Sequence, residues 1–290
     1  LAGMGEIDEN VAAVQRHIWT IGDYPAVAER MFAVAESTVE LAGIAEGQRV
    51  LDVATGDGNA ALLAGRRGAS VVGVDLTPAQ LEKARTRLAS EGLEVELHQG
   101  DVQALDVDDD SFDVVVSVLG MIFAPDHAAA LGEMVRVCRP GGTVAAAAWA
   151  EGGWMGRWRA TVAEQLAPGS APTPAPGTGP DAWGDPAEVR RRFAAVGLEV
   201  DVHERLLEWT FASPEAALDF YLEASGPFIA FMDGMRQQGL EDQARELLRQ
   251  CMVDADTSAS ATAGCRLESP YLVMVAHLPS ANLSEESVDR

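Results

Sequence analysis

The spacing of apolar residues predicts strands that alternate with helices from about residue 48 to residue 150. Short apolar runs bounded by turn residues predict strands, and the segments between them have helical spacing. The predicted strands are residues 50–54, 71–74, 95–98, 114–119 and 143–149. Because strands and helices alternate, the pattern predicts a mainly parallel sheet with helices on both faces, a doubly wound α/β fold.

Helical spacing also occurs on both sides of this region. Residues 11–19 and 25–42 predict helices that fold over the edge of the sheet. After the fifth strand, a predicted helix at 155–166 leads into the segment 168–180, where prolines and glycines exclude periodic structure. A helix at 186–195 and a sixth strand within 198–211 follow.

Several helix starts can be read from single residues. Thr77, followed by Pro78 and Gln80, predicts a capping box with proline in the first turn. Asp185 and Ser213, each followed by proline, carry the same start signal.

The end of the chain adds a second helical region. Residues 214–254 have helical spacing with many large apolar side chains, and residues 271–277 predict a last strand. This order predicts a helical cap inserted between the sixth and seventh strands. We expect N-terminal helices at 1–45, the α/β core at 46–211, the cap at 212–266, the final core strand at 267–280 and a polar tail at 281–290.

Composition and charge reduce the number of expected classes of binding partner. The 290 residues include 45 acidic and 21 basic ones, which gives a net charge of -24. Such a charge repels phosphate backbones and anionic membranes, so neither is an expected partner. With no apolar run of about 18 to 20 residues, we expect a cytoplasmic protein. Three scattered cysteines predict neither a disulfide framework nor a metal site. The sequence leaves monomer and homodimer open.

The strongest chemical signal is VLDVATGDG at residues 50–58, a strand that runs into a glycine-rich turn and a helix. Glycines let the backbone approach a ligand, and open sheets bind ligands beyond the carboxyl ends of their strands. The spacing Gly56-x-Gly58-x-x-Ala61 also fits a dinucleotide motif, in which a helix N-terminus holds a pyrophosphate. The turn alone therefore fits two classes of ligand.

Charge favours one of these classes. Asp52 and Asp57 lie in or beside the turn, and no lysine or arginine follows until Arg66. Carboxylates beside a pyrophosphate are unfavourable, whereas they favour a cation. S-adenosylmethionine carries a sulfonium and an ammonium group, so the acidic turn favours it over NAD. The alternative for Asp52 is a structural role within the turn.

Two further acids follow successive strands. Asp75 ends the second strand, where a carboxylate can accept hydrogen bonds from both ribose hydroxyls. Asp101 follows the third strand and can accept from the adenine amino group, while Val102 offers a backbone amide to the ring. Each acid alone is also typical of a helix cap or turn. Together with the glycine turn, they predict a nucleoside site.

The segment 51–149 resembles the class I methyltransferases, especially the ubiquinone-biosynthesis-like group. The matching segments are VLDVATGDG (50–58), VGVDLT (72–77), GDV (100–102), FDVV (112–115) and RPGG (139–142). The resemblance implies a seven-stranded sheet with an antiparallel last strand, and S-adenosylmethionine as methyl donor with S-adenosylhomocysteine as product. Ala54 departs from the family, because many members have glycine there, but its small side chain should be tolerated.

The resemblance also implies roles for individual residues. Trp19 and Tyr24 are candidates to close over the methionine end of the donor, and their alternative is a place in the core. Ser117 lies where the family has a backbone contact to the donor. The full set of candidate donor-binding residues is Trp19, Tyr24, Asp52, Ala54, Thr55, Gly56, Gly58, Asn59, Asp75, Leu76, Gln80, Asp101, Val102 and Ser117.

The reaction itself needs few dedicated groups, because methyl transfer mainly requires that donor and acceptor are aligned and water is excluded. If the acceptor must lose a proton, His127 is the candidate base. Its alternative is an ordinary place in the first turn of a helix.

The large apolar side chains of the cap suit a small apolar or aromatic acceptor, as in natural-product biosynthesis, methylated on O, N or C. Alternatively, they form the cap's own core. Two other functions stay open. One is an NAD(P)-dependent oxidoreductase, and the other is a protein that binds S-adenosylmethionine without methyl transfer.

Overall fold

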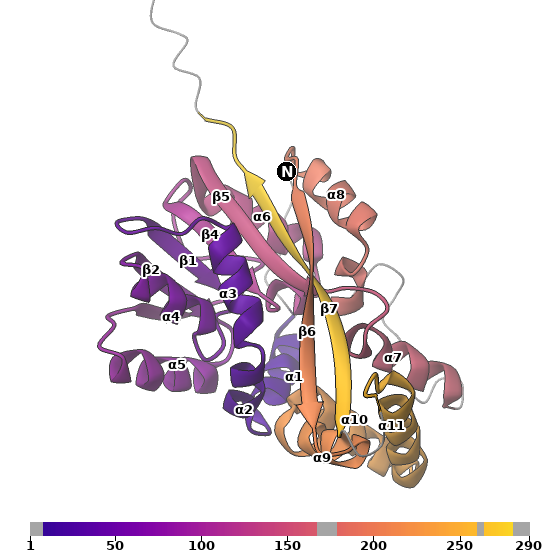
Figure 1. The fold of residues 1–290 in the computed structure, drawn as a ribbon. Helices are drawn as coiled ribbons and strands as arrows, with labels where there is room; N and C mark the ends of the chain where they lie inside the picture. Colours follow the sequence, from indigo (N-terminus) through magenta and orange to yellow (C-terminus); the bar gives the residue numbers. More distant parts are fainter. Residues whose placement is uncertain (1–7, 167–178, 260–263, 281–290) are drawn as a thin grey trace, which may run out of the picture.

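The computed structural model describes residues 8–166, 179–259 and 264–280, which form a seven-stranded sheet with the order β3-β2-β1-β4-β5-β7-β6 (Figure 1). β1 to β5 are parallel to one another, and β7 runs antiparallel to both β5 and β6. The predicted doubly wound fold with an antiparallel last strand is confirmed. The strands are β1 Arg49–Val53, β2 Ser70–Asp75, β3 Glu96–Gln99, β4 Phe112–Val118, β5 Cys138–Trp149, β6 Asp201–Phe211 and β7 Cys265–His277.

Helices cover both faces of the sheet. Figure 1 shows α3 in front of the sheet and α6 behind it. None of the helices in the described ranges is long and apolar enough to cross a membrane. The helices are α1 Glu9–Thr20, α2 Tyr24–Arg30, α3 Phe32–Leu41, α4 Asn59–Arg66, α5 Pro78–Ser90, α6 His127–Val137, α7 Trp154–Gln165, α8 Pro186–Ala195, α9 Pro214–Ala224, α10 Gly226–Gln237 and α11 Glu241–Ala255, with short 3-10 helices η1 Met121–Phe123 and η2 Pro180–Trp183.

The central strands are buried on both faces, as their continuous apolar runs predict. The four alanines 145–148 of β5 are fully buried, and the first two lie opposite Val116 and Ser117 of β4. Small side chains at these positions let helices pack closely on the sheet, and this fixes the strand ends beyond which a ligand can bind.

Two local predictions need correction. The helix expected at 25–42 is divided at Met31, where ψ is 3°, into α2 and α3. The capping box at Thr77 does not form, because Asp75 takes the Thr77 N–H and the Gln80 amide donates to the Trp19 carbonyl. Asp185 and Ser213 do cap their helices.

The last two strands extend beyond the rest of the sheet. β6 pairs with β7 along its whole length, from Asp201 opposite Val275 to Phe211 opposite Cys265, so β7 starts earlier than its apolar run at 271–277 predicts. The helices α9, α10 and α11 lie between these strands in the chain. They cluster at the end of the β6–β7 pair where β6 ends and β7 begins (Figure 1). The predicted segments 168–178 and 281–290 lie outside the described residues.

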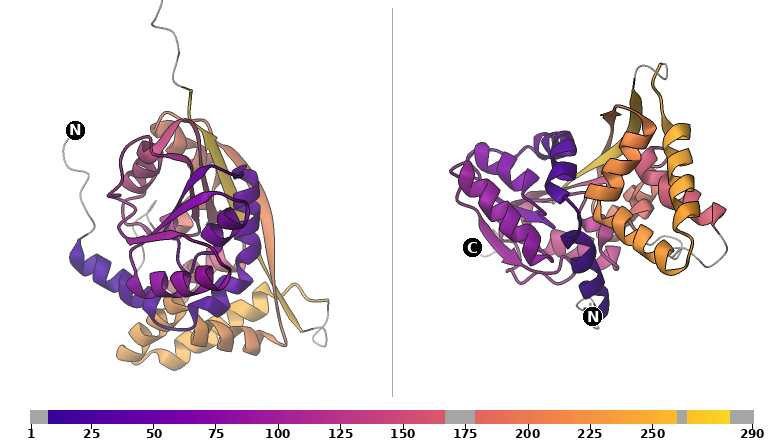
Figure 2. Two further views of the ribbon diagram at one scale, coloured as in Figure 1. Left: turned by 90° about the vertical axis from the view of Figure 1, so that its left-hand side faces the viewer. Right: turned by 90° about the horizontal axis from the view of Figure 1, so that it is seen from below.

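The N-terminal helix packs against this cap. Figure 2 shows α1 beside α10 when the molecule is seen from below. At the contact, a Cβ on Gly226 would lie 1.9 Å from the Ile18 carbonyl oxygen, and one on Gly22 would lie 2.5 Å from the Ala224 carbonyl oxygen. Both glycines are therefore required by close backbone approach. These close contacts fix the position of α1 relative to the cap.

Candidate functional site

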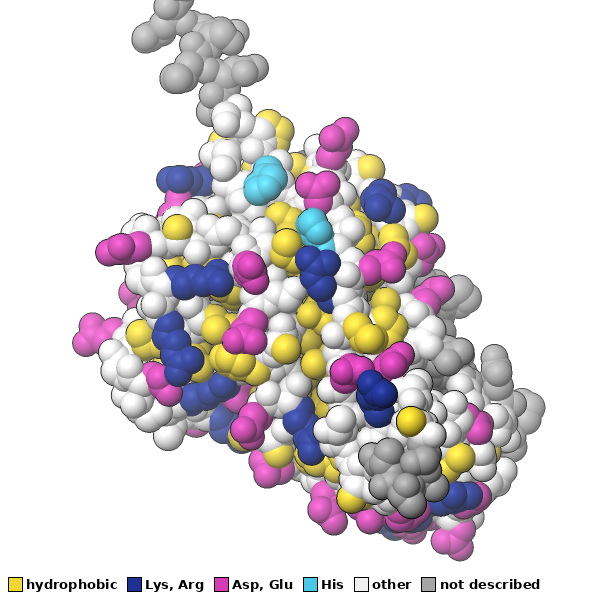
Figure 3. Space-filling model, viewed as in Figure 1, with side chains coloured by type: hydrophobic (Ala, Val, Ile, Leu, Met, Phe, Trp, Pro, Cys, Tyr) yellow, Lys and Arg dark blue, Asp and Glu magenta, His cyan; other side chains and the backbone are white. Residues whose placement is uncertain are grey.

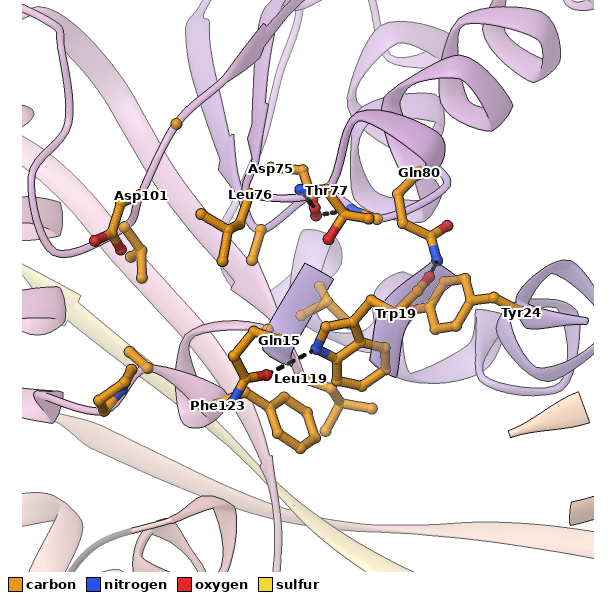
Figure 4. Close-up of a pocket in the computed structure, with 18 residues that line it drawn as sticks. Gln15, Trp19, Tyr24, Asp75, Leu76, Thr77, Gln80, Asp101, Leu119 and Phe123 are labelled. Atoms are coloured by element: carbon orange, nitrogen blue, oxygen red, sulfur yellow. Dashed lines mark hydrogen bonds between the residues drawn. The ribbon is translucent and has the colours of Figure 1, made fainter. Parts of the chain in front are cut away.

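A cavity lies at the carboxyl ends of β1, β2 and β4, where open α/β sheets bind ligands (Figure 4). Its empty volume, including the open mouth, is about 730 Å³. The lining residues are Gln15, Trp19, Tyr24, Ala54, Gly56, Asp75, Leu76, Thr77, Gln80, Gly100, Asp101, Val102, Val118, Leu119, Gly120, Phe123, Ala124 and Pro125.

Asp52 holds the glycine-rich turn in shape and does not line this cavity. The side chain is 1% exposed, and its Oδ2 accepts from the Thr55 hydroxyl at 2.6 Å and from the Ala61 N–H at 2.9 Å. Burial raises the pKa of Asp52 to about 7, although both hydrogen bonds favour the charged form. Its geometry matches the structural alternative, since it ties β1 to the first turn of α4.

Strained backbone marks the wall of the cavity. Ala54 has φ 55° and Leu119 has φ 57°, a conformation that residues other than glycine rarely adopt. Gly120 follows Leu119, and a Cβ there would lie 2.5 Å from the Ala54 Cβ. Strain of this kind gathers at functional sites, because the surrounding structure must maintain it. Ala54 adopts this backbone conformation despite its Cβ, and that Cβ makes glycine necessary at position 120.

Asp75 is fixed at the edge of the cavity by two backbone amides. Its Oδ2 accepts from the Gly56 N–H and its Oδ1 from the Thr77 N–H, both at 2.8 Å. Burial raises the pKa of Asp75, and these two hydrogen bonds oppose the shift. Each carboxylate oxygen can accept more than one hydrogen bond. Asp75 can therefore also accept from a ligand.

Asp101 lies at the opposite end of the cavity, in the turn after β3 (Figure 4). Its Oδ1 accepts from the Gln103 N–H at 3.0 Å, and its two oxygens accept from the Gln103 side-chain amide at 3.2 and 3.1 Å. Leu76, Val102 and the two carboxylates thus lie along one edge of the sheet, as the sequence predicts for a nucleoside site.

The N-terminal helices supply an aromatic wall. The Trp19 ring meets the Phe123 ring edge-on at 4.8 Å and the Tyr24 ring at 5.8 Å between centroids. The Trp19 Nε1–H donates to Gln15 Oε1 at 3.2 Å. Burial raises the pKa of Tyr24, and nearby Asp57, Asp75 and Asp52 act in the same direction, so the phenol stays neutral.

Three predicted residues support the turn from outside the cavity. Asn59 donates to the Ala28 carbonyl at 2.9 Å and accepts from Arg87 at 2.7 Å. Gly58 has φ 90° and starts α4, while Thr55 donates to Asp52. These contacts give all three a structural role, and their predicted contact with a donor stays a prediction.

Ser117 also lies outside the lining residues. Its hydroxyl donates to the Val53 carbonyl at 2.7 Å and accepts from the Met121 N–H at 2.9 Å. It therefore connects β4 to β1 and to the start of η1. Its neighbours Val118 and Leu119 line the cavity instead.

His127 is buried beside α8 and does not line the cavity. Arg192 donates to its Nδ1 at 3.0 Å, which leaves the Nε2–H to donate to the Ile122 carbonyl at 3.2 Å. Burial and the Arg192 charge lower the pKa of His127, so the ring stays neutral. Both nitrogens are occupied, and this arrangement favours a structural role over the predicted role as a base.

Sequence reasoning missed several lining residues. Gln15 lies four residues before Trp19 and therefore shares its helix face, a signal that the spacing contains. Phe123 and Leu119 follow the fourth strand, where the strand-end rule also applies. Gln103 does not line the cavity, and only the structure reveals its contact with Asp101.

The aromatic residues of the cap pack against one another and against Trp158 of α7. Trp158 stacks on Phe228 at 4.1 Å and Phe228 on Tyr221 at 4.9 Å between centroids, and all three are at most 3% exposed. None of them lines the cavity. They form the core of the cap, in line with the alternative stated for these residues.

Known proteins share the sequence and the fold. Residues 50–142 match the profile of a family described as "Methyltransferase domain". The chain is 40% identical over 225 residues to an uncharacterized protein of Mycobacterium tuberculosis, which covers 77% of this chain and 80% of that protein. It is 42% identical over 124 residues to the methyltransferase GfsG of Streptomyces halstedii, over 42% of this chain and 45% of that one. The solved structure of the YcgJ protein of Bacillus subtilis has the same fold, with a TM-score of 0.58 at 15% identity over 86% of this chain and 99% of that one.

Proposed function

Because the chain belongs to the class I S-adenosylmethionine-dependent methyltransferases, we propose that it transfers a methyl group from S-adenosylmethionine to a small apolar or aromatic metabolite. One observation carries the proposal. Among the described residues that line the cavity, Asp75 and Asp101 are acidic, and none is lysine or arginine. Such a cavity favours a cationic nucleoside over a diphosphate.

The residues present fit the donor. Asp75 has acceptor capacity for the ribose hydroxyls, and Asp101 has it for the adenine amino group. Gly56 leaves room for the methionine end, because a Cβ there would lie 3.3 Å from the ring and hydroxyl of Tyr24. A larger side chain at position 56 would fill this part of the cavity.

The position of Asp52 disfavours the alternative of a dinucleotide. Its carboxylate accepts the Ala61 N–H in the first turn of α4, where the dinucleotide motif would place a pyrophosphate. Asp57 adds a second buried carboxylate beside this turn, paired with Arg87 at 3.0 Å. A buried carboxyl group of the fold thus occupies the position that the rival ligand needs.

The main role of the protein in the reaction is to align the donor with the acceptor and to exclude water from the cavity. S-adenosylmethionine supplies the methyl group on a positively charged sulfur. Trp19, Leu119 and Phe123 give the cavity an apolar wall that excludes water, and Asp75 and Asp101 hold the nucleoside in register. Displacement at an activated carbon needs no dedicated base, and we assign none.

The acceptor is proposed to be small and apolar because of that wall and because of the charge of the protein. The net charge of -24 disfavours nucleic acid. On the face shown in Figure 3, acidic side chains lie among the basic ones and offset their charge.

Transfer of labelled methyl groups tests the proposal. The protein is incubated with methyl-tritiated S-adenosylmethionine and three fractions of a bacterial extract: small molecules, protein and nucleic acid. We expect label in small molecules that partition into organic solvent, and no transfer by the Gly56→Val variant. Label confined to protein or nucleic acid would contradict the proposed acceptor class. Donor binding with no transfer to any fraction would favour a binding protein that does not methylate.

A further inference from the structure

Gln103 connects the two walls at the end of the cavity where Asp101 lies. It is 3% exposed, and its side-chain amide donates to both carboxylate oxygens of Asp101. Its Oε1 accepts from the Asp126 N–H at 2.8 Å. Every hydrogen-bonding atom of this side chain except one amide hydrogen is therefore accounted for by these partners.

The second contact reaches the opposite wall of the cavity. Asp126 caps α6 by accepting from the Ala128 and Ala129 amides, and it directly follows Ala124 and Pro125, which line the cavity. Gln103 thus holds the turn after β3 and the loop after η1 at a fixed separation. The Gln103 backbone N–H already holds Oδ1 of Asp101, and the side-chain amide adds contacts to both oxygens that fix the carboxylate in one rotamer.

We propose that Gln103 is a positioning residue that orients Asp101 toward the 6-amino group of the donor's adenine and thereby sets the preference of the site for adenine. This inference rests on the proposed function, since it concerns the same donor site. Gln103 does not touch the ligand itself and acts through Asp101. Ligands that lack the 6-amino group should therefore be insensitive to its loss.

Calorimetry with two ligands tests this role. The ligands are S-adenosylhomocysteine and its purine analogue, which lacks the 6-amino group. The variants are Gln103→Met, which keeps the length of the side chain and removes its hydrogen bonds, and Gln103→Glu, which still accepts from the Asp126 N–H but places a second carboxylate against Asp101. Gln243→Met, on the exposed face of α11, is the matched control.

We expect both Gln103 variants to bind S-adenosylhomocysteine about tenfold more weakly, the loss typical of one hydrogen bond to a charged group. The affinity for the purine analogue should change by less than about twofold in the same variants. In the Asp101→Ala background, Gln103→Met should have no further effect, because the two residues act as one unit.

Three results would overturn the inference: unchanged affinity for S-adenosylhomocysteine, equal weakening for both ligands, or additive losses in the double variant. Equal weakening would indicate a general structural role, which thermal unfolding of the same variants would register. Absence of S-adenosylhomocysteine binding by the wild-type protein would instead contradict the proposed function. The two failures are thus distinguishable.

Discussion

Asp52 and Asp75 end neighbouring strands, yet the structure gives them different surroundings. Asp52 is enclosed by the turn and accepts hydrogen bonds from Thr55 and Ala61. Asp75 is held by backbone amides at the edge of the cavity. The strand-end rule predicts that both lie near the site, but it does not predict which one faces a ligand, because that depends on the path of the turn.

Removing the charge of either cavity carboxylate should weaken donor binding. We expect Asp75→Asn and Asp101→Asn each to reduce the affinity for S-adenosylhomocysteine by about 1 to 3 kcal/mol, the range for lost hydrogen bonds to charged groups. Calorimetry measures the change. Glu94→Gln, which removes an exposed charge outside the cavity, is the control and should bind as the wild type does. Equal affinities in the wild type and the three variants would contradict the assignment of Asp75 and Asp101 to the donor site.

Asp52 should make the stability of the protein depend on pH. Its pKa in the folded state is about 7, above the ordinary value of 3.8, so the folded state binds this proton more tightly than the unfolded state does. Its contribution to the free energy of unfolding is therefore complete below about pH 4 and decreases as the pH rises toward 7.

In the Asp52→Asn variant, the free energy of unfolding should fall less as the pH rises. Urea unfolding at several pH values between 4 and 8 should show a smaller loss of stability in the variant than in the wild type, by up to about 1.4 kcal/mol per pH unit. Asp57 and Asp75 shift in the same direction, so some pH dependence remains. Parallel curves for variant and wild type would show that Asp52 does not titrate in this range.

The contact between Ala54 and Gly120 gives a further residue-scale prediction. Gly120→Ala should lower both stability and affinity for S-adenosylhomocysteine, because its Cβ would lie 2.5 Å from the Ala54 Cβ and 2.9 Å from the Ala54 carbonyl oxygen. Adding Ala54→Gly removes the first clash and relieves the positive φ, so the double variant should recover part of both losses. A double variant as impaired as Gly120→Ala would contradict this packing account.

At the scale of elements, α1 and α10 meet through backbone that leaves no room for a side chain. Gly226→Ala should reduce the free energy of unfolding by about 1 to 3 kcal/mol, the usual effect of overpacking, and should weaken donor binding because α1 carries Trp19. Gly234→Ala lies on the same helix with nothing within 4 Å of the new Cβ. This control should stabilise the protein by about 1 kcal/mol through helix propensity.

Urea unfolding and calorimetry on both glycine variants check this prediction. If Gly226→Ala were as stable as Gly234→Ala and bound S-adenosylhomocysteine like the wild type, the two helices would not be held together as the structure indicates.

The sequence predicts which segments form strands and which form helices, but it does not predict where several of these elements begin or end. The alternation of apolar runs with helical spacing is strong because β1, β2, β4 and β5 are buried over most of their length. The extra residues of β7 could not be predicted, since Arg266 and Glu268 break the apolar run and are held in the ladder by pairing with β6 and by hydrogen bonds to residues 256 and 257.

At the scale of the whole molecule, a strongly acidic protein surrounds a cavity whose lining is acidic as well. The overall charge could be read from the sequence, and so could the nucleoside end of the site, because its residues follow the ends of successive strands at one sheet edge. On the opposite wall, Trp19 and Tyr24 were implied by the resemblance, but the meeting of α1 with η1 there is visible only in three dimensions. For the same reason His127 was expected near the acceptor, although the fold turns it toward α8.

The central claim is that this acidic cavity binds a cationic nucleoside and not a dinucleotide. Titration calorimetry of the wild-type protein with S-adenosylmethionine, S-adenosylhomocysteine and NAD tests it most directly. The account predicts saturable binding of both sulfur nucleosides, lost or strongly weakened in Asp75→Asn, and no binding of NAD. Saturable binding of NAD without binding of either sulfur nucleoside would contradict it.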